Sequence, residues 1–309
     1  MKKALLSVAT IMVLGFLNFY FFMPGTLFAI FQKIERKTGG LEEKNIMVNG
    51  LNIHYLEGGK GDPLVLIHGF GGNKDHWTRI SRFLTPYFNV IAPDLPGFGE
   101  SDEEPHGKYS IKDQAQFLKQ FIEQLGIKSF HIGGNSMGGY IAGQYAALFP
   151  GDLKSLFLIS PAGVLSSEFS QMQQRIKNGG PNPLIAKDAG EFDELLEFIF
   201  VKKPFIPGPI KNYLKDEAIR HQALNETIFQ LIKDTELNEP MESLLDHLDV
   251  NAFILWGAED KVLHPSGARI LEAIIKNSKA LVLKNVGHVP MIELPKKTAG
   301  LYLEFHNMK

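Results

Sequence analysis

A single serine lies within a run of glycines at residues 133–140, which read GGNSMGGY. Its centre is a G-x-S-x-G pattern, with Ser136 between Gly134 and Gly138. An apolar stretch that suits a strand precedes the run, and a helical pattern follows it. A serine at such a sharp strand-to-helix turn is exposed to substrate, and the glycines leave room for the bend. We therefore predict that Ser136 is a nucleophile.

Other uses of a glycine-rich loop fit this stretch less well. A phosphate loop requires a Gly-Lys-Ser/Thr sequence, and residues 133–140 contain no lysine. A dinucleotide-binding fingerprint requires G-x-G-x-x-G followed by an acidic residue, and the residues after Gly133 do not match it. A purely structural glycine turn stays possible, because G-x-S-x-G alone is a short pattern.

A nucleophilic serine needs a histidine as base and a carboxylate to orient that histidine. With a serine on this kind of turn, the acid follows in the chain and the histidine comes last. The predicted strand ILWGAED ends at Glu259 and Asp260, and His288 lies in a loop after the final predicted strand. We prefer Asp260 because its shorter side chain holds an imidazole more rigidly. Glu259 is the alternative acid, and His264 is the alternative base.

Two backbone amides are candidates for stabilising a negatively charged oxygen in the reaction. One follows the nucleophile, at Met137, and the other belongs to an early glycine loop, HGFGG, most simply at Phe70. His68 opens that loop, and a structural hydrogen bond is its expected role. Asp94 lies in a turn rich in proline and glycine and is expected to anchor the turn.

Composition excludes several other classes of function. The chain of 309 residues has a net charge of −2 and no cysteine. We therefore predict no nucleic-acid partner and no thiolate metal site. His68, Asp75 and His76 are close in sequence but lack the spacing of a zinc-binding helix. We predict no metal and no cofactor.

Buried apolar strands alternate with helical patterns along most of the chain. This order is typical of an α/β fold with a mostly parallel, doubly wound sheet. An Asn49-Gly50 pair between two alternating segments predicts a β-hairpin. Between the fourth and fifth buried strands the pattern becomes helical, which predicts a cap over the carboxyl ends of the strands. We divide the chain into 1–31, 32–45 (linker), 46–163 (first part of the core), 164–245 (cap) and 246–309 (second part of the core).

The first 31 residues differ from the rest. After two lysines, the segment from Ala4 to Phe31 has no ionisable side chain except Tyr20, and it exceeds the roughly 20 apolar residues that span a bilayer. We expect an uncleaved N-terminal membrane helix and a membrane-associated protein, in the inner membrane if the source is bacterial. A cleaved signal peptide and a secreted or periplasmic protein are the alternative. The oligomeric state is left open.

Five segments together resemble the α/β-hydrolase superfamily: HGFGG, DLPGFGESD, GNSMGGY, WGAEDKV and VGHVPMIELP. The resemblance extends from Ile46 to the C-terminus. It implies an α/β-hydrolase fold in which Ser136, Asp260 and His288 are nucleophile, acid and base, with the Phe70 and Met137 amides as the oxyanion hole. The sequence is most similar to membrane-anchored monoacylglycerol lipases and to bacterial lipases and esterases of the same branch.

These observations predict a serine carboxylic ester hydrolase that acts on acylglycerols or other lipid esters. The alternative is a carbon–carbon bond hydrolase acting on ring-cleavage products, because GNSMGG occurs in those enzymes as well. They usually carry a proline in the glycine loop where this chain has HGFGG. A non-enzymatic binding protein on the same fold is disfavoured, since all three triad residues are present.

Overall fold

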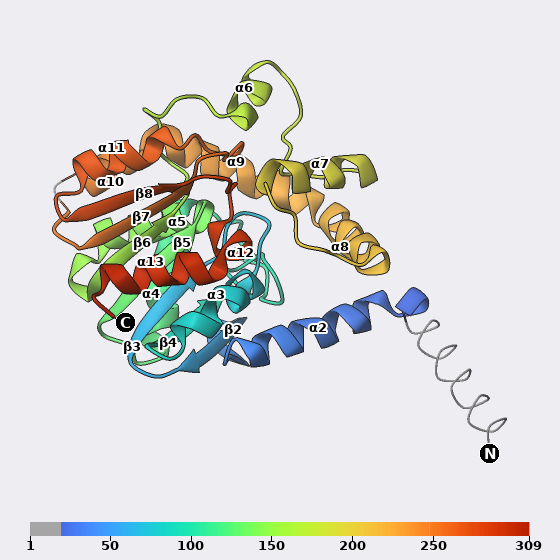
Figure 1. Cartoon of the computed structure of the whole chain (residues 1–309), viewed down its shortest axis with the longest axis horizontal. Coiled ribbons are helices and arrows are strands. Elements are labelled where there is room, and N and C mark those ends of the chain that lie inside the picture. The colour runs from blue at the N-terminus through green and yellow to red at the C-terminus, as the bar shows by residue number, and fades with distance from the viewer. Residues whose placement is uncertain (1–19, 247, 309) are drawn as a thin grey trace.

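An eight-stranded sheet forms the centre of the molecule (Figure 1), in the strand order β1-β2-β4-β3-β5-β6-β7-β8. The structure is a computed structural model that describes residues 20–246 and 248–308. The strands are β1 (Glu42–Val48), β2 (Leu51–Gly59), β3 (Asp62–Ile67), β4 (Phe88–Pro93), β5 (Phe130–Asn135), β6 (Leu153–Ile159), β7 (Ala252–Gly257) and β8 (Ser278–Leu283).

The pairing of the strands confirms the predicted fold class. Strands β1 and β2 form an antiparallel hairpin, and β2 also pairs antiparallel with β4. All other pairs are parallel. The hairpin turn is the predicted Asn49-Gly50 pair, with φ of 52° and 86°. Positive φ at both positions is what a two-residue type I′ turn requires.

Helices cover both faces of the sheet. In β6, Leu156 and Leu158 face one apolar core while Phe157 and Ile159 face the other, as expected for a strand buried on both sides. Helices α4, α5, α10 and α11 belong to the first side, and α3, α12 and α13 to the second. Their bounds are α3 (Thr78–Leu84), α4 (Ile111–Gln124), α5 (Met137–Leu148), α10 (Met241–Leu245), α11 (Ser266–Ile274), α12 (Pro290–Glu293) and α13 (Pro295–Phe305), with short 3-10 turns η1 (Lys74–Trp77) and η2 (Pro150–Asp152).

The chain between β6 and β7 is helical, in agreement with the sequence pattern. In Figure 1 most of this insertion lies at one end of the sheet, beyond the strands. Its helices are α6 (Gln171–Lys177), α7 (Ala189–Ile199), α8 (Gly208–Arg220), α9 (Gln222–Asn238) and α10. We call this segment, residues 164–245, the cap.

Helix α2 (Pro24–Thr38) precedes the sheet and corrects one expectation. Residues 32–45 were predicted to be a polar linker, but they form the second half of α2 and the start of β1. The physical reason is a charge network: Arg36 donates two hydrogen bonds to Asp75, at 2.6 and 2.7 Å, and pairs with Glu43. The polar side chains of this segment therefore have partners in the fold.

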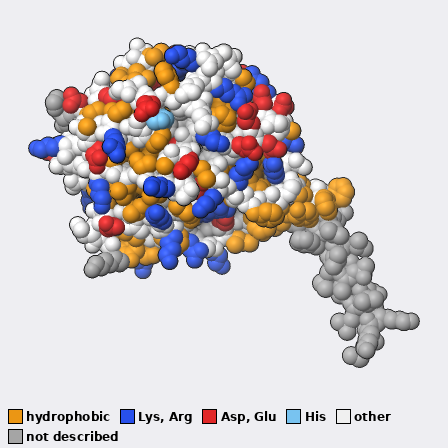
Figure 2. Space-filling view, turned by 45° about the horizontal axis from the view of Figure 1, so that its top comes forward, with side chains coloured by type: hydrophobic (Ala, Val, Ile, Leu, Met, Phe, Trp, Pro, Cys, Tyr) orange, Lys and Arg blue, Asp and Glu red, His pale blue; other side chains and the backbone are white. Residues whose placement is uncertain are grey.

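The segment predicted to be a membrane helix, residues 1–31, lies mostly outside the described residues. Within residues 20–246 and 248–308, no helix has both the length and the apolar character needed to cross a membrane. Figure 2 shows hydrophobic side chains gathered on the arm that α2 forms. The exposed apolar side chains there are Phe21, Phe22, Met23, Ile30, Phe31 and Ile34.

Replacing Phe157 by alanine should destabilise the fold by about 3–5 kcal/mol, since truncating a buried aromatic ring leaves a cavity. The ring is fully buried in the second core and stacks on Tyr302, with centroids 4.3 Å apart. Urea denaturation followed by circular dichroism measures the change. The control is Phe205→Ala, because the Phe205 side chain is 91% exposed and its loss should change stability by less than about 0.5 kcal/mol. Equal effects of the two variants would contradict this assignment of the core.

Candidate active site

The backbone turns sharply at Ser136, between strand β5 and helix α5. Ser136 has φ of 57° and ψ of −121°, a conformation that non-glycine residues rarely adopt. Three backbone hydrogen bonds hold it: its amide donates to Ile159, and its carbonyl accepts from Tyr140 and Ala162, each at 3.0 Å. These hydrogen bonds to the surrounding backbone therefore hold Ser136 in its strained conformation.

Two glycines make this turn sterically possible. A Cβ atom on Gly134 would lie 2.1 Å from the carbonyl oxygen of Gly138. A Cβ atom on Gly138 would lie 2.2 Å from the carbonyl oxygen of Ile67, at the end of the neighbouring strand β3. Both obstacles are backbone atoms, which cannot swing aside as a flexible side chain can. The sequence pattern around Ser136 is thus explained by close backbone packing.

Asp260 and His288 form a hydrogen-bonded pair at the ends of neighbouring strands. His288 Nδ1 lies 2.8 Å from Asp260 Oδ2, and both side chains are buried. The other carboxylate oxygen accepts hydrogen bonds from the amides of Val262 and Leu263, at 2.8 and 3.0 Å. A carboxylate held in this way directs the Nδ1 hydrogen of the imidazole toward itself, which leaves Nε2 free to act as a base.

Three further residues hold His288, and sequence reasoning did not find them. The Asn135 side chain donates to the His288 carbonyl at 3.0 Å, and the His288 amide donates to the Ile199 carbonyl at 2.9 Å. Glu293 accepts from the amide of Gly287 at 2.8 Å. Burial raises the pKa of Glu293, and the amides of Lys202, Gly287 and Val201 oppose that rise. Asn135 had one sequence signal: a polar residue at the end of a buried strand must find a hydrogen-bond partner.

Phe70 and Met137 lie with Ser136 on the wall of one cavity of about 340 Å³. Among the described residues, no acceptor takes the amide hydrogen of Phe70 or Met137, and the Ser136 hydroxyl makes no hydrogen bond. Gly72 donates to the Gly69 carbonyl at 3.0 Å and closes the glycine loop into a turn. The structure thus brings together on one cavity wall the serine and the two residues predicted to supply oxyanion-hole amides.

The alternative candidates have other roles. His68 is fully buried, with Nδ1 donating to the Gly69 carbonyl and Nε2 accepting from the Leu95 amide, so neither ring nitrogen is free. Burial lowers its pKa. Glu259 accepts from the amide of Val286, and His264 contacts Ser266. Asp94 anchors its turn as expected, accepting from the Lys74 ammonium and from the Glu100 amide.

One group of potential metal ligands exists in the described part of the chain. Glu43, His54 and Glu100 bring their ligand atoms within 4.8 Å of one another. Arg36 and Lys74 pair with both carboxylates of this group. Protein cations therefore already neutralise its charge, and it lies apart from the cavity that contains Ser136.

Replacing Gly138 by alanine should abolish ester hydrolysis and lower the melting temperature, because the new Cβ atom would overlap the Ile67 carbonyl. Gly151→Ala is the matched control, since a Cβ atom at Gly151 meets nothing within 4 Å. Differential scanning fluorimetry and a p-nitrophenyl ester assay measure the two effects. A Gly138→Ala variant with unchanged melting temperature and activity would contradict the packing described for the turn.

Comparison with known proteins identifies the family. The family described as alpha/beta hydrolase fold matches residues 62–295. Lipase 1 of Psychrobacter immobilis is 35% identical over 280 residues, which cover 89% of this chain and 87% of that protein. Human monoacylglycerol lipase ABHD6 is 31% identical over 304 residues, covering 95% and 90%.

A solved structure is similar over nearly the whole chain. The crystal structure of a membrane phospholipase A, described as a bacterial virulence factor, has a TM-score of 0.90 and 37% identity, and covers 99% of this chain and 98% of its own. A hydrolase of 2-hydroxy-6-oxo-6-phenylhexa-2,4-dienoate from Rhodococcus, at 22% identity and a TM-score of 0.74, shares the fold. This chain belongs to the α/β-hydrolase family, as an enzyme of the carboxylic ester hydrolase class.

Proposed function

We propose that this enzyme cleaves lipid esters through an acyl-enzyme intermediate on Ser136. The observation that carries the proposal is the hydrogen bond between His288 Nδ1 and Asp260 Oδ2, in a fold that also turns Ser136 into a cavity. Monoacylglycerol is the preferred substrate class, because relatives that share about a third of the sequence are named as lipases and monoacylglycerol lipases.

The reaction proceeds in two halves that use the same groups. Ser136 Oγ attacks the ester carbonyl carbon while His288 Nε2 takes the hydroxyl proton. The tetrahedral intermediate collapses, the bond to the leaving oxygen breaks, and His288 returns the proton to the departing alcohol. Water then attacks the acyl-enzyme, with His288 again as base, and releases the fatty acid and free Ser136. Asp260 keeps the imidazole in the required tautomer and stabilises its positive charge.

The amides of Phe70 and Met137 are the proposed oxyanion hole. The carbonyl oxygen becomes negatively charged when Ser136 attacks, and amide hydrogens without another acceptor stabilise that charge. Losing one such donor lowers kcat by about 100- to 1000-fold in a well-studied serine protease. Because both donors are backbone groups, the side chains of Phe70 and Met137 are free to line the cavity.

The composition of the cavity wall favours a substrate with a long apolar acyl group. Thirteen of its lining residues are apolar: Phe70, Met137, Ala162, Leu165, Phe169, Met172, Ile176, Leu184, Phe229, Ile232, Leu237, Val262 and Leu263. Burying a methylene group in such a wall contributes about 0.8 kcal/mol. An alkyl chain of several carbons therefore gains substantial binding free energy there.

The exposed apolar side chains of α2 and of the residues just before it support the proposal that the enzyme acts at a lipid surface. Phe22 is 77% exposed and Phe21 is 59% exposed, on the same arm of the molecule as Ile34. An exposed apolar patch of this kind is common at protein or membrane contacts. We propose that residues 1–31 and the exposed face of α2 keep the enzyme at the membrane where its substrates reside.

Ser136→Ala should abolish hydrolysis of p-nitrophenyl acyl esters and labelling by a fluorophosphonate probe, because both reactions need the serine oxygen. Circular dichroism should show an unchanged fold. Ser160→Ala is a control at another buried serine of positive φ that does not line the cavity. Full activity of Ser136→Ala would contradict the proposed nucleophile, and cleavage of dienone ring-cleavage products in preference to esters would favour the carbon–carbon bond hydrolase alternative.

Asp260→Asn should lower kcat by about 10⁴-fold, because an asparagine amide stabilises the wrong imidazole tautomer. Glu259→Gln is the matched control, since Glu259 is the adjacent carboxylate and accepts from the Val286 amide rather than contacting His288 among the described residues. Steady-state hydrolysis of a p-nitrophenyl ester measures both variants. A larger loss in Glu259→Gln than in Asp260→Asn would reverse the assignment of the acid.

A further inference from the structure

Polar side chains of the cap lie on the wall of the otherwise apolar cavity. Gln173 and Lys177 come from α6, and Lys233 and Glu236 come from α9. Ser136 is the other polar residue of that wall in the described part of the chain. An apolar pocket with a few converging polar groups is typical of a site that fixes the orientation of its ligand.

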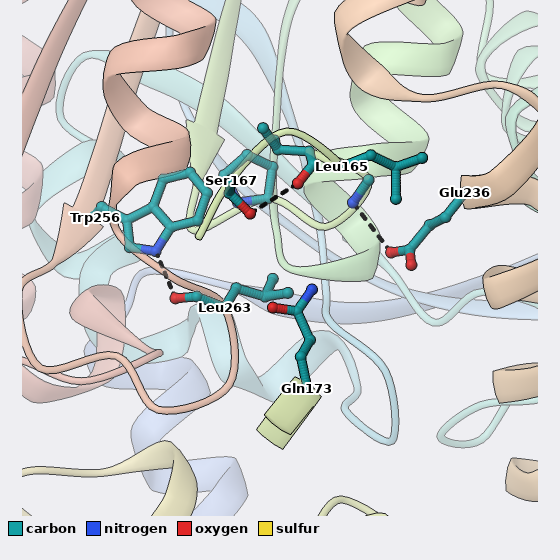
Figure 3. Close-up of a pocket in the computed structure, with 9 residues that line it drawn as sticks. Leu165, Ser167, Gln173, Glu236, Trp256 and Leu263 are labelled. Carbon is teal, nitrogen blue, oxygen red and sulfur yellow. Dashed lines mark hydrogen bonds between the residues drawn. The ribbon is translucent and has the colours of Figure 1, made fainter. Parts of the chain in front are cut away.

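Glu236 is the polar residue whose position is best defined. Figure 3 shows its carboxyl group and the Gln173 amide directed toward a common pocket from different helices. This smaller pocket shares Leu165, Gln173, Glu236 and Leu263 with the large cavity, so Glu236 lines both. Glu236 Oε1 accepts from the Gly163 amide at 3.1 Å. Among the described residues, Oε2 has no hydrogen-bond partner.

The connection from Glu236 to the nucleophile is short. The Ser136 carbonyl accepts from the Ala162 amide, and the next amide along the chain, at Gly163, donates to Glu236. Two hydrogen bonds and one peptide unit therefore join the two residues. Glu236 and Ser136 thus line one cavity and are linked through the backbone of Ala162 and Gly163.

The charges around Glu236 favour a neutral ligand. Burial raises the pKa of Glu236 to about 7, the Gly163 amide and Lys233 oppose that rise, and Glu242 adds to it. Tyr140, whose hydroxyl donates to the Glu239 carbonyl, also faces these carboxylates. A carboxyl group that is only partly ionised near neutral pH can both accept and donate a hydrogen bond. A hydroxyl group has the matching capacity for both.

We propose that Glu236 binds a free hydroxyl group of the glycerol in a monoacylglycerol and so selects for a polyhydroxylated leaving group. The proposal rests on the proposed function, because it places the ester of the same lipid at Ser136. Gln173 supplies a second hydrogen-bonding group from another helix of the cap.

Charged head groups fit this wall less well. In the small pocket a phosphate would meet the Glu236 carboxyl group, and like charges at close range repel, whereas Lys177 and Lys233 line the large cavity but not the small pocket. A quaternary ammonium would meet Lys177 and Lys233 on the cap helices. Glycerol carries neither charge, and each of its hydroxyl groups can both donate and accept.

The test compares esters that share one acyl chain and differ in the leaving group. The substrates are 1-decanoylglycerol, methyl decanoate and decanoyl lysophosphatidylcholine, and the readout is the ratio of kcat/KM values. The unaltered enzyme should prefer the glycerol ester to the methyl ester. Glu236→Met should reduce that preference about tenfold, because the hydrogen bond to the partly ionised carboxyl group is lost. Glu236→Gln should restore part of the preference, since the amide still bonds a hydroxyl.

Glu242→Met is the matched control. Glu242 anchors the same loop by accepting from the amides of Leu165 and Ser166, yet it does not line either pocket. The kcat/KM values on the two esters are measured on the same variant. A general loss of folded protein therefore lowers both values equally and leaves their ratio unchanged.

Three outcomes would overturn the proposal. One is an equal loss of kcat/KM on the glycerol and methyl esters in Glu236→Met. Another is the same change of the ratio in Glu242→Met. The third has two parts: the unaltered enzyme prefers the lysophospholipid to the glycerol ester, and Glu236→Met does not change that preference. Failure of the proposed function is distinct from these, since it would show as no cleavage of any ester together with no labelling of Ser136.

Discussion

The backbone passes from strand β5 to helix α5 at one residue, Ser136. The φ of Ser136 is 57°, and this sharp turn restricts which residues can lie next to the serine. No side chain fits at Gly134 or Gly138, because the turn presses backbone against backbone. The contact of Gly138 with the end of β3 also brings the glycine loop beside the serine. A single strained turn thus determines where Ser136, the Met137 amide and the neighbouring glycine loop lie.

The loops that carry Ser136, Asp260 and His288 lie at one edge of the sheet because of its parallel topology. Strands β5, β6, β7 and β8 are neighbours in that order and run in one direction, so the loops after them meet at one edge. Ser136, Asp260 and His288 follow β5, β7 and β8, which is why residues far apart in the sequence could be predicted to meet. The pattern of buried strands and the chain order of motifs were sufficient for this part of the site.

Other parts of the site could not be predicted, because they depend on contacts without a local pattern. The His288 amide donates to Ile199, at the end of a cap helix, and no sequence feature marks that pairing. Glu236 likewise looks like an ordinary exposed residue of an amphipathic helix. Only the placement of α9 over the cavity shows that its carboxyl group faces inward. The helical content of the cap and its position over the carboxyl ends of the strands were predicted from the sequence, whereas the direction of single cap side chains was not.

Charged residues just after the glycine loop form ion pairs that connect this loop to helix α2, near the start of the chain. Lys74 is almost fully buried, with its ammonium 2.8 Å from Asp94, and it also pairs with Glu100. Its neighbour Asp75 accepts two hydrogen bonds from Arg36 of α2. A buried pair of this kind adds little net stability, but breaking it leaves a charge without a partner and costs several kcal/mol. Because the two pairs begin two and three residues after the HGFGG loop, they fix that loop, and with it Phe70, relative to α2. The polar stretch that resembled a solvated linker therefore joins the apolar N-terminal arm to one wall of the site.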